Sequence, residues 1–509
     1  MFKKSKEPQN DAQKEPLPQK SETINSQTVK QLFADSADVN IDPLLVGADG
    51  HLRVTVIHVD GMVNTELTDN FILKPLVQED IFKTAKTEKE LIDLIMDGAV
   101  YHSRRTLHTN LSDCLNDLLS GSIMLVFDKA KKAITFEAKG FEKRGIVEPT
   151  NENVLKGSKE SFIEVLRVNT ALVRRRLPSH NLVMNQLVVG LRTHTAVSLV
   201  YLKDVANPQI VEDIKNSIQN IKSDGVTSAG QIESYLIGSR HSFFPQILYT
   251  ERVDKFCGNI AEGRIGILID GMPIAYILPV TINAFLQAPE DYALNYIASS
   301  LFRILRYACY FIALVLPAFY VSVTTFHQEM IPTDLAVAII TSRQGTPFPI
   351  FLEVILMLSA FEILLEAGLR LPKAIGQTVS IVGALVVGQA AISANLLSPG
   401  VVIVIAASGI TGFVMPSQDM ANALRICRFI LVFISIIGGM FSIALGLILI
   451  LYHLCTIEVF GVPYLSPYVA NEGKELLDDS FVRKPWYKLK YRPSNISPQD
   501  PVRLGDDDE

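Results

Sequence analysis

The chain has 509 residues, a formal net charge of −6 and a positive mean hydropathy of +0.26. The modest charge says little about partners, and the five cysteines are scattered without a Cys-x-x-Cys pair. They are interpreted as small apolar residues, which argues against a disulfide framework or a zinc site. No apolar stretch follows the basic start MFKKSK, so no cleaved signal peptide is expected and the N-terminal region is expected in the cytoplasm.

Composition divides the chain into distinct parts. Residues 1–27 are rich in Lys, Gln, Glu, Pro and Ser, which predicts a disordered tail. The mixed polar and apolar sequence that follows predicts two α/β (α+β) subdomains, at 28–147 and 148–300. Long apolar runs then predict a transmembrane helical domain at 301–456, followed by a basic and then acidic cytoplasmic tail at 457–509.

The first subdomain contains strand and helix patterns. RVTVIHVDG at 53–61 predicts a strand that ends at Asp60-Gly61. Apolar residues at helical spacing predict helices in TEKELIDLIMDG and NLSDCLNDLLSG, each stopped by a glycine. IMLVFD at 123–128 and AITFEA at 133–138, joined by a lysine-rich turn, predict a hairpin.

The second subdomain alternates helices and strands. SKESFIEVLRVNTALVRRRL at 158–177 predicts a helix, and QLVVGL and TAVSLVYL predict strands. Pro208 suits the first turn of a helix, because that turn tolerates a missing N–H. RIGILID at 264–270, followed by Gly271 and MPIAYILP, predicts two strands joined by a tight turn.

Four or five apolar segments are predicted in the helical domain, at about 304–324, 350–368, 369–400, 400–415 and 428–453. Arginines at 303 and 306 favour a cytoplasmic start for the first segment. Five complete crossings would place the basic tail outside. Either the second segment therefore lies in the interface or one segment is re-entrant, and an even number of crossings with both termini cytoplasmic is favoured.

The segment 369–400 has an unusual composition. It is long enough to cross a bilayer, yet it consists largely of small residues and carries amides that a lipid-facing helix would avoid. Hydrogen bonding within a packed bundle and lining of a pore both explain this composition. In the second interpretation, the candidate pore-lining or gate residues are Gln377, Val382, Leu385, Val386, Gln389, Ser393 and Asn395.

A charged stripe precedes this segment. Glu362, Glu366 and Arg370 recur at four-residue spacing and share one helix face, whereas Glu353 lies about 180° around the helix. A structural ion pair or an interfacial polar stripe explains the pattern. A carboxylate ring that attracts cations in an oligomeric pore explains it as well.

The arginines of the second subdomain and the missing enzyme motifs limit the function. Arg174, Arg175 and Arg176 point in different directions on a helix and no aromatic stacking platform accompanies them. Ion pairs or solvation are therefore expected, and nucleic acid binding is not. Signatures of phosphate loops, dinucleotide sites, zinc proteases and nucleophile elbows are missing from the sequence, so neither an enzyme nor a cofactor or metal site is expected.

Four motifs follow one another along the chain: EPTNENVLKGSKESFIEVLRVNTALVRRRL at 148–177, SFFPQILYTERVDKFCGNIAEGRIGILIDGMPIAYILP at 242–279, FHQEMIPTDLAVAI at 326–339 and EILLEAGLRLPKAIGQTVSIVGALVVGQAAISANLLSPGVVIVIA at 362–406. They resemble, in the same order, motifs of the GerA-type spore germination proteins, specifically the A subunit of nutrient germinant receptors. Cys257 departs from the family pattern, in which a non-cysteine residue is expected at that position.

The resemblance implies a multi-pass protein of the spore inner membrane, with its N-terminal domain on the cytoplasmic (core) side. It implies assembly with a transporter-like B subunit that recognises the nutrient and with a C lipoprotein. It also implies a homo-oligomeric ring in membrane lipid whose helices form a nutrient-gated cation channel. Two alternatives are a related component of the dipicolinic-acid release machinery and a solute-binding or transport subunit.

Overall fold

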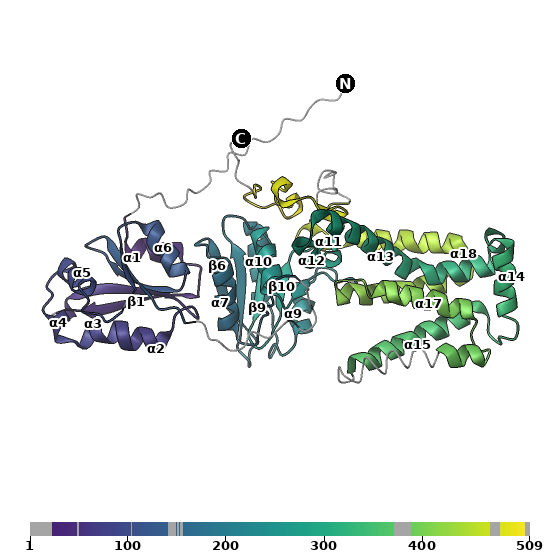
Figure 1. The fold of residues 1–509 in the computed structure, drawn as a ribbon, viewed down its shortest axis with the longest axis horizontal. Helices are drawn as coiled ribbons and strands as arrows, with labels where there is room; N and C mark the ends of the chain where they lie inside the picture. Colours follow the sequence, from purple (N-terminus) through teal and green to yellow (C-terminus); the bar gives the residue numbers. More distant parts are fainter. Residues whose placement is uncertain are drawn as a thin grey trace, which may run out of the picture. The chain divides into compact units, whose positions relative to one another are not determined.

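The protein forms two compact units, which are described separately (Figure 1). The sheet unit comprises Met1–Ile237, Ile247–Pro279 and Leu489–Glu509, and the helical unit comprises Gly238–Gln246 and Val280–Lys488. The computed structural model describes residues 23–47, 50–102, 104–140, 149, 152, 156–370, 388–468 and 479–503.

The first half of the sheet unit is an antiparallel five-stranded sheet in the order β1-β2-β4-β5-β3. Alternate residues of the central strand, β4, point to opposite faces of the sheet. Ile123 and Leu125 pack with α5, and Met124 and Val126 pack with α1 and α6. The elements are α1 (Ser26–Leu32), β1 (Val39–Val46), β2 (Leu52–Val59), α2 (Thr65–Thr68), η2 (Asp69–Leu73), α3 (Lys74–Gln78), α4 (Asp80–Lys83), α5 (Glu88–Met96), β3 (Arg105–His108), α6 (Leu111–Leu119), β4 (Ser122–Phe127) and β5 (Lys132–Glu137).

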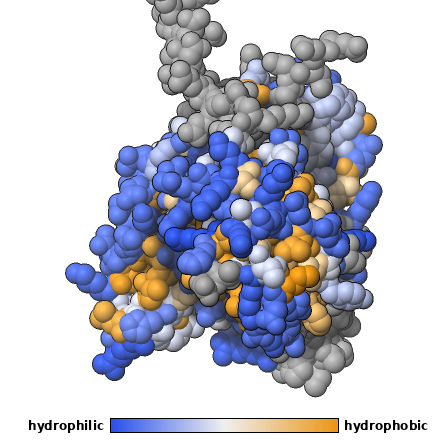
Figure 2. Space-filling model, turned by 90° about the vertical axis from the view of Figure 1, so that its left-hand side faces the viewer, coloured by the Kyte–Doolittle hydropathy of each residue, from blue (hydrophilic) through white to orange (hydrophobic). Residues whose placement is uncertain are grey.

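These elements confirm the predictions for this half. The predicted strand at 53–61 is β2, the predicted hairpin is β4 with β5, and the two predicted helices are α5 and α6. Burial of both faces of the sheet explains why β4 reads as a continuous apolar run, without alternation between apolar and polar residues. The face of the sheet unit drawn in Figure 2 is mostly hydrophilic, with smaller hydrophobic areas between.

The second half is another antiparallel five-stranded sheet, in the order β6-β7-β9-β10-β8. Pro208 occupies the first helical position of α8, as predicted. The elements are α7 (Leu166–Arg176), β6 (Leu182–Val189), β7 (Thr195–Leu202), α8 (Pro208–Gln219), α9 (Ala229–Leu236), β8 (Leu248–Thr250), α10 (Val253–Ala261), β9 (Ile265–Ile269) and β10 (Ala275–Leu278).

Helix α7 is shorter than the predicted helix at 158–177, because residues 158–165 at the start of that range are not helical. Ser161 forms an isolated antiparallel β-bridge with Arg252. The Asn169 side chain accepts from Ile163 N–H at 2.9 Å and donates to Ile163 O at 2.6 Å. An asparagine that bonds a nearby backbone competes with helix formation.

A buried ion pair joins the two halves of the sheet unit. Arg174 of α7 is fully buried, and its Nε and Nη2 each donate to Asp38, which precedes β1, at 2.9 Å. The guanidinium also donates to the carbonyl oxygens of Ser179 and Leu182 at 3.0 Å. Arg176, two residues further along, lies at the surface, where it donates to Ser158 Oγ at 3.2 Å and contacts Glu160 at 3.5 Å. Ion pairing, one of the interpretations of the arginine triplet, therefore describes this cluster.

Replacing Arg174 by Met should destabilise the sheet unit strongly, because Asp38 would stay buried without its partner. The expected cost is about 3–5 kcal/mol, or about 10 °C in the melting temperature of the purified chain. Arg176→Met is the matched control, since its side chain is 37 % exposed and exposed pairs contribute about 1 kcal/mol or less. Equal losses in the two variants would contradict the assignment.

The helical unit is organised around α13. Its elements are α11 (Ile282–Leu286), α12 (Glu290–Ala293), α13 (Tyr296–Thr325), η3 (Gln328–Met330), α14 (Thr333–Ser342), α15 (Ile350–Arg370), α17 (Pro399–Gly412), α18 (Gln418–Thr456), β11 (Glu458–Val459), β12 (Val462–Pro463) and η5 (Trp486–Lys488). Within the described ranges, α13 and α18 are long and apolar enough to cross a membrane. The expected bundle of four or five crossings stays a prediction, since α15 carries four charged residues and α17 has only 14 residues.

Helix α18 folds back on itself at two glycines. Gly438 and Gly439 have non-helical backbone angles, and Gly439 takes φ 57° with ψ −134°, which suits a residue without a side chain. A Cβ on Gly446 would lie 2.7 Å from Leu431 Cδ2, whereas a straight helix would separate these positions by about 22 Å. The single crossing predicted at about 428–453 is therefore two helical arms, 418–437 and 440–456.

Each unit contains a segment that is remote from it in sequence. In the sheet unit, Gln499 N–H donates to Val205 O at 2.8 Å, and Arg492 Nε donates to Ala261 O at 3.0 Å. In the helical unit, Ser242 Oγ lies 2.9 Å from Nε2 of His453 in the second arm of α18.

Candidate functional site in the helical unit

Glu353 of α15 anchors the start of α17. Its side chain is fully buried, and one carboxylate oxygen accepts from Ser398 N–H at 2.8 Å and from Ser398 Oγ at 2.7 Å. Ser398 is the N-cap residue of α17, so the carboxylate faces the positive end of that helix dipole. Arg343 Nη2 lies 3.4 Å from the other carboxylate oxygen. The negative charge of Glu353 is therefore stabilised by groups of the helical unit itself.

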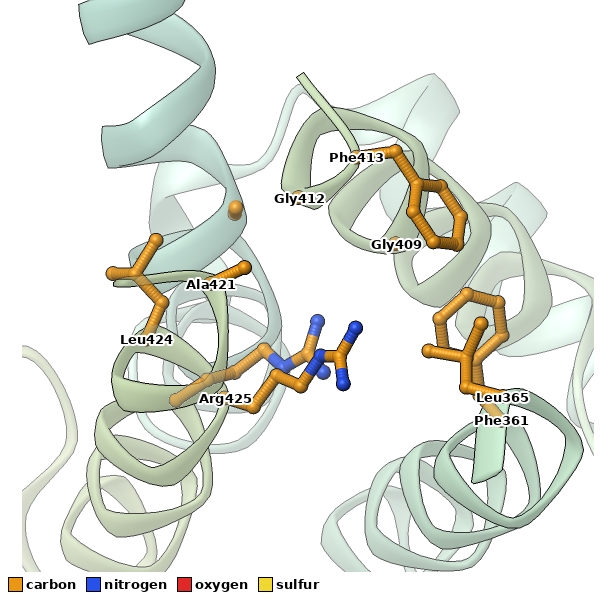
Figure 3. A pocket seen from close by; sticks show the side chains of 10 residues that line it. Phe361, Leu365, Gly409, Gly412, Phe413, Ala421, Leu424 and Arg425 are labelled. Atoms are coloured by element: carbon orange, nitrogen blue, oxygen red, sulfur yellow. The ribbon is translucent and has the colours of Figure 1, made fainter. Parts of the chain in front are cut away.

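Glu362, the first residue of the predicted charged stripe, pairs with arginines of α18. Its carboxylate pairs with Arg428 at 2.5 Å and lies 3.7 Å from Arg425 Nε. Arg428 also donates to Ser408 Oγ of α17 at 3.2 Å. Arg425 points into the space between α18 and the helices that carry Phe361 and Gly409 (Figure 3). The cavity there is about 20 Å³, enough for one water molecule at most.

The rest of the predicted stripe lies at the surface. Glu366 and Arg370 form an ion pair at 2.6 Å, with side chains 61 % and 79 % exposed. Their i, i+4 spacing is the geometry expected for such a pair. Whether Glu362 and Glu366 belong to a cation-attracting ring stays a prediction.

The predicted pore-lining residues are described in part. Gln377, Val382, Leu385 and Val386 lie outside the described residues. Gln389, Ser393 and Asn395 are all exposed. Asn395 has φ 54°, a left-handed conformation that asparagine tolerates better than most residues, and it lies just beyond the helical residues 388–393. Their role in a pore stays a prediction.

A second charged cluster, at the start of α13, was not recognised from the sequence. Asp291 of α12 is buried and accepts from Arg303 Nε at 3.0 Å and from Arg306 Nη1 at 2.9 Å. Arg303 also pairs with Asp479 at 2.8 Å, and Arg483 donates to the Asp291 carbonyl at 2.6 Å. The only sequence signal was two arginines at the edge of an apolar run, interpreted as a marker of topology.

The arginines keep Asp291 ionised. Burial by itself would raise the pKa of this carboxyl. The hydrogen bond from Arg306 and the charges of Arg306 and Arg303 outweigh burial and hold the pKa below its ordinary value. The stability that Asp291 contributes is present above the unfolded-state pKa, about 3.9, and is lost as pH falls through the lower folded-state pKa.

Asp291→Asn should therefore destabilise the helical unit in a pH-dependent way. At neutral pH the expected loss is about 3–5 kcal/mol, because Arg303 and Arg306 lose their shared carboxylate. Thermal melts of the detergent-purified chain should show a difference from the wild type that is largest at pH 7 and shrinks below about pH 4. Asp334→Asn, at an exposed position of α14, should change little at any pH. A difference for Asp291→Asn that is independent of pH would refute the electrostatic account.

The sheet unit contains a cavity of about 260 Å³ that opens to solvent. Its lining includes Asp60, Arg167, Ser198 and Asp270, contributed by both halves of the unit. Arg167 pairs with Asp60 at 2.8 Å, and Asp270 accepts from the N–H of Leu166 at 3.1 Å. Ser198 is only 3 % exposed and lines this cavity. The cavity is large enough for one small polar molecule.

Cys114 and Cys257 of the sheet unit are both buried. Burial raises the pKa of the Cys114 and Cys257 thiols to about 12, so neither is a ready nucleophile. Within the part of the chain that the structure describes, no three His, Cys, Asp or Glu side chains gather in a way that would hold a metal ion.

Comparison with known proteins identifies the class. The family model described as "Bacillus/Clostridium GerA spore germination protein" matches residues 27–495. Spore germination protein KA of Bacillus subtilis (strain 168) is 35 % identical over 95 % of this chain and 88 % of its own length. Uncharacterized membrane protein YfkQ of the same organism is 38 % identical over 87 % of this chain and 85 % of its own length.

A solved structure also aligns. It is the crystal structure of the N-terminal domain of the A subunit of the Bacillus megaterium spore germinant receptor GerK3. The alignment covers 50 % of this chain and 96 % of that one, with 25 % identity and a TM-score of 0.41.

The chain belongs to the GerA family of spore germination proteins. This finding confirms the resemblance seen in the sequence motifs. The relatives are named as spore germination proteins, and several are similar over most of their own length.

Proposed function

We propose that this chain is the A subunit of a nutrient germinant receptor and that copies of it assemble into a nutrient-gated cation channel. One observation carries the proposal: polar and charged side chains are exposed on, or next to, apolar helices of the helical unit. They are Glu366, Arg370, Gln389, Ser393 and Asn395. In a single copy placed in a bilayer these groups would face lipid, which is costly. Packing against further copies around a water-filled path removes that cost.

The fold-back of α18 supports a membrane topology with both ends on one side. The first arm ends near the end of α13, since a Cβ on Gly439 would lie 3.0 Å from Phe326 Cβ. After the second arm, Tyr464 O accepts from Ile282 N–H at 2.9 Å, ahead of α13. The chain thus returns to the side on which α13 begins. This supports an even number of crossings, with the sheet unit on the cytoplasmic (core) side of the spore inner membrane.

The proposed assembly includes a transporter-like B subunit that recognises the nutrient and a C lipoprotein. Nutrient binding to the partner would shift the pore from closed to open. Apolar side chains at Val382, Leu385 or Val386 would gate it by excluding water. A component of the dipicolinic-acid release machinery would share this architecture, and co-purification of its own partner set would distinguish it.

The sign of the charge at the Glu366–Arg370 pair should control ion preference if the pair lines the path. Glu366→Gln should lower the preference for K⁺ over Cl⁻, and Arg370→Gln should raise it. An exposed unit charge changes the local energy of an ion by about 1 kcal/mol, or about fivefold in local concentration. Reversal potentials in planar bilayers with the reconstituted receptor would measure this.

The two variants control for each other, because both break the same ion pair. A purely structural pair predicts the same change in both, and such a result would exclude Glu366 from the path. Absence of nutrient-dependent conductance from the wild-type receptor would refute the channel itself.

The cavity of the sheet unit favours a second candidate function, the binding of a small polar solute. Its carboxylates outnumber its arginine, since Asp38, Asp60 and Asp270 line it together with Arg167 alone. Arg174, which does not line the cavity, neutralises the charge of Asp38. A solute with an amino group and hydroxyl or amide groups fits this lining, with Ser198 as a further hydrogen-bonding partner.

Asp270→Asn and Ser198→Ala should each weaken binding of such a solute about tenfold, the effect of losing one hydrogen bond to a charged or buried group. Calorimetric titration of the full chain with a panel of free amino acids and sugars would measure it. Asp224→Asn, whose side chain is 75 % exposed and lies outside the cavity lining, is the control. No binding from the whole panel, or equal weakening by the control, would rule this function out.

A further inference from the structure

Residues 482–488 are fixed against the first turns of α13. Arg483 N–H donates to Ser300 Oγ at 3.0 Å, and the Arg483 guanidinium donates to the Asp291 carbonyl at 2.6 Å. The Trp486 ring lies 5.7 Å from the same guanidinium, a cation–π distance. The charged cluster at Asp291 therefore holds this stretch beside the point where α13 begins.

The outer surface of this region combines aromatic, apolar and basic side chains. Trp486 is 48 % and Tyr487 is 68 % exposed, and Lys488 Nζ lies 5.8 Å from the Tyr487 ring. In the first turns of α13, Ile297 and Leu301 are 64 % and 65 % exposed. Tryptophan and tyrosine concentrate where a membrane meets water, because their rings are apolar and their N–H or O–H is polar. These five residues are called the interfacial face.

The charge of the region is positive. The sequence 483–488, RKPWYK, contains three basic residues and no acidic one. The nearby carboxylates of Asp291 and Asp479 are already paired with Arg303 and Arg306. The exposed Lys488 adds positive charge next to the exposed apolar and aromatic groups. Basic residues next to a membrane span are attracted to anionic headgroups.

We propose that the interfacial face binds the anionic lipid headgroups of the bilayer that α13 enters. Two features favour a lipid surface over a protein partner. The exposed apolar residues continue into a helix that is long and apolar enough to cross a membrane, and the charge complements anionic headgroups. The inference rests on the membrane placement in the proposed function, but it does not depend on conduction.

Trp486 is the only tryptophan in the chain, so fluorescence excited selectively from tryptophan reports on this face alone. The full chain would be reconstituted into vesicles of phosphatidylcholine with or without phosphatidylglycerol. Either lipid would carry bromine near the top of its acyl chains. Trp486 emission should be quenched by both brominated lipids, and at equal mole fraction brominated phosphatidylglycerol should quench at least twice as strongly.

Variants separate the charge from the aromatic contact. Lys484→Gln with Lys488→Gln should abolish the preference for phosphatidylglycerol and leave quenching by brominated phosphatidylcholine intact. The matched control, Lys129→Gln with Lys222→Gln, removes two exposed lysines of the sheet unit and should keep the preference. Trp486→Phe should remove the signal and so confirm its source.

Several results would overturn the inference. Emission that neither lipid quenches would mean that Trp486 faces water or another protein surface. Equal quenching by the two lipids would remove the anionic specificity. Protein that does not co-float with vesicles would refute the membrane placement, whereas inserted protein with unquenched Trp486 would refute only the interfacial face.

Discussion

Burial of guanidinium groups is the constraint on which both units depend. Arg174, Arg252 and Arg303 are among the largest fully buried side chains of the described structure. Arginine stays protonated at any pH that a protein survives, so each buried guanidinium needs acceptors close by. Arg174 finds Asp38, which lies 136 residues away, and Arg303 finds carboxylates in two different segments. Arg174 and Arg303 thereby fix chain segments that local sequence does not bring together.

The same constraint accounts for two buried or half-buried carboxylates of the helical unit. Glu353 and Glu362 are satisfied by Ser398 and by Arg428, within one copy of the chain. Such contacts are expected wherever charge is withdrawn from water. Glu366 and Arg370 of α15 pair with each other at the surface, and the polar groups around residues 388–395 are exposed as well. They are therefore the groups for which assembly or water would supply the missing environment.

The sequence predicted the elements whose signals are local. The hairpin of β4 and β5, the helices α5 and α6 and the proline that opens α8 all follow from residue spacing and turn chemistry. The motifs of the family were equally readable, because they combine many residues in a fixed order.

What the sequence did not predict depends on long-range contacts or on backbone angles. The partner of Arg174 is chosen by the packing of two sheets, which periodicity does not report. The fold-back of α18 occurs inside an unbroken apolar run, where Gly438 and Gly439 look like ordinary small residues of a membrane helix. The early part of the predicted helix at 158–177 became extended because an asparagine side chain bonds its backbone. The pore candidates before residue 388 lie outside the described residues, so their assignment rests on composition alone.

Each of the two units is built from segments that are not consecutive in the sequence. The chain passes between them after residues 237, 246, 279 and 488. A fragment that stops at residue 279 therefore lacks the tail that supplies donors to Val205 and Ala261, and it leaves Glu262 without Arg503, 2.9 Å away. The sheet unit is therefore complete only after residues 280–488, nearly all of the helical unit, have been synthesised.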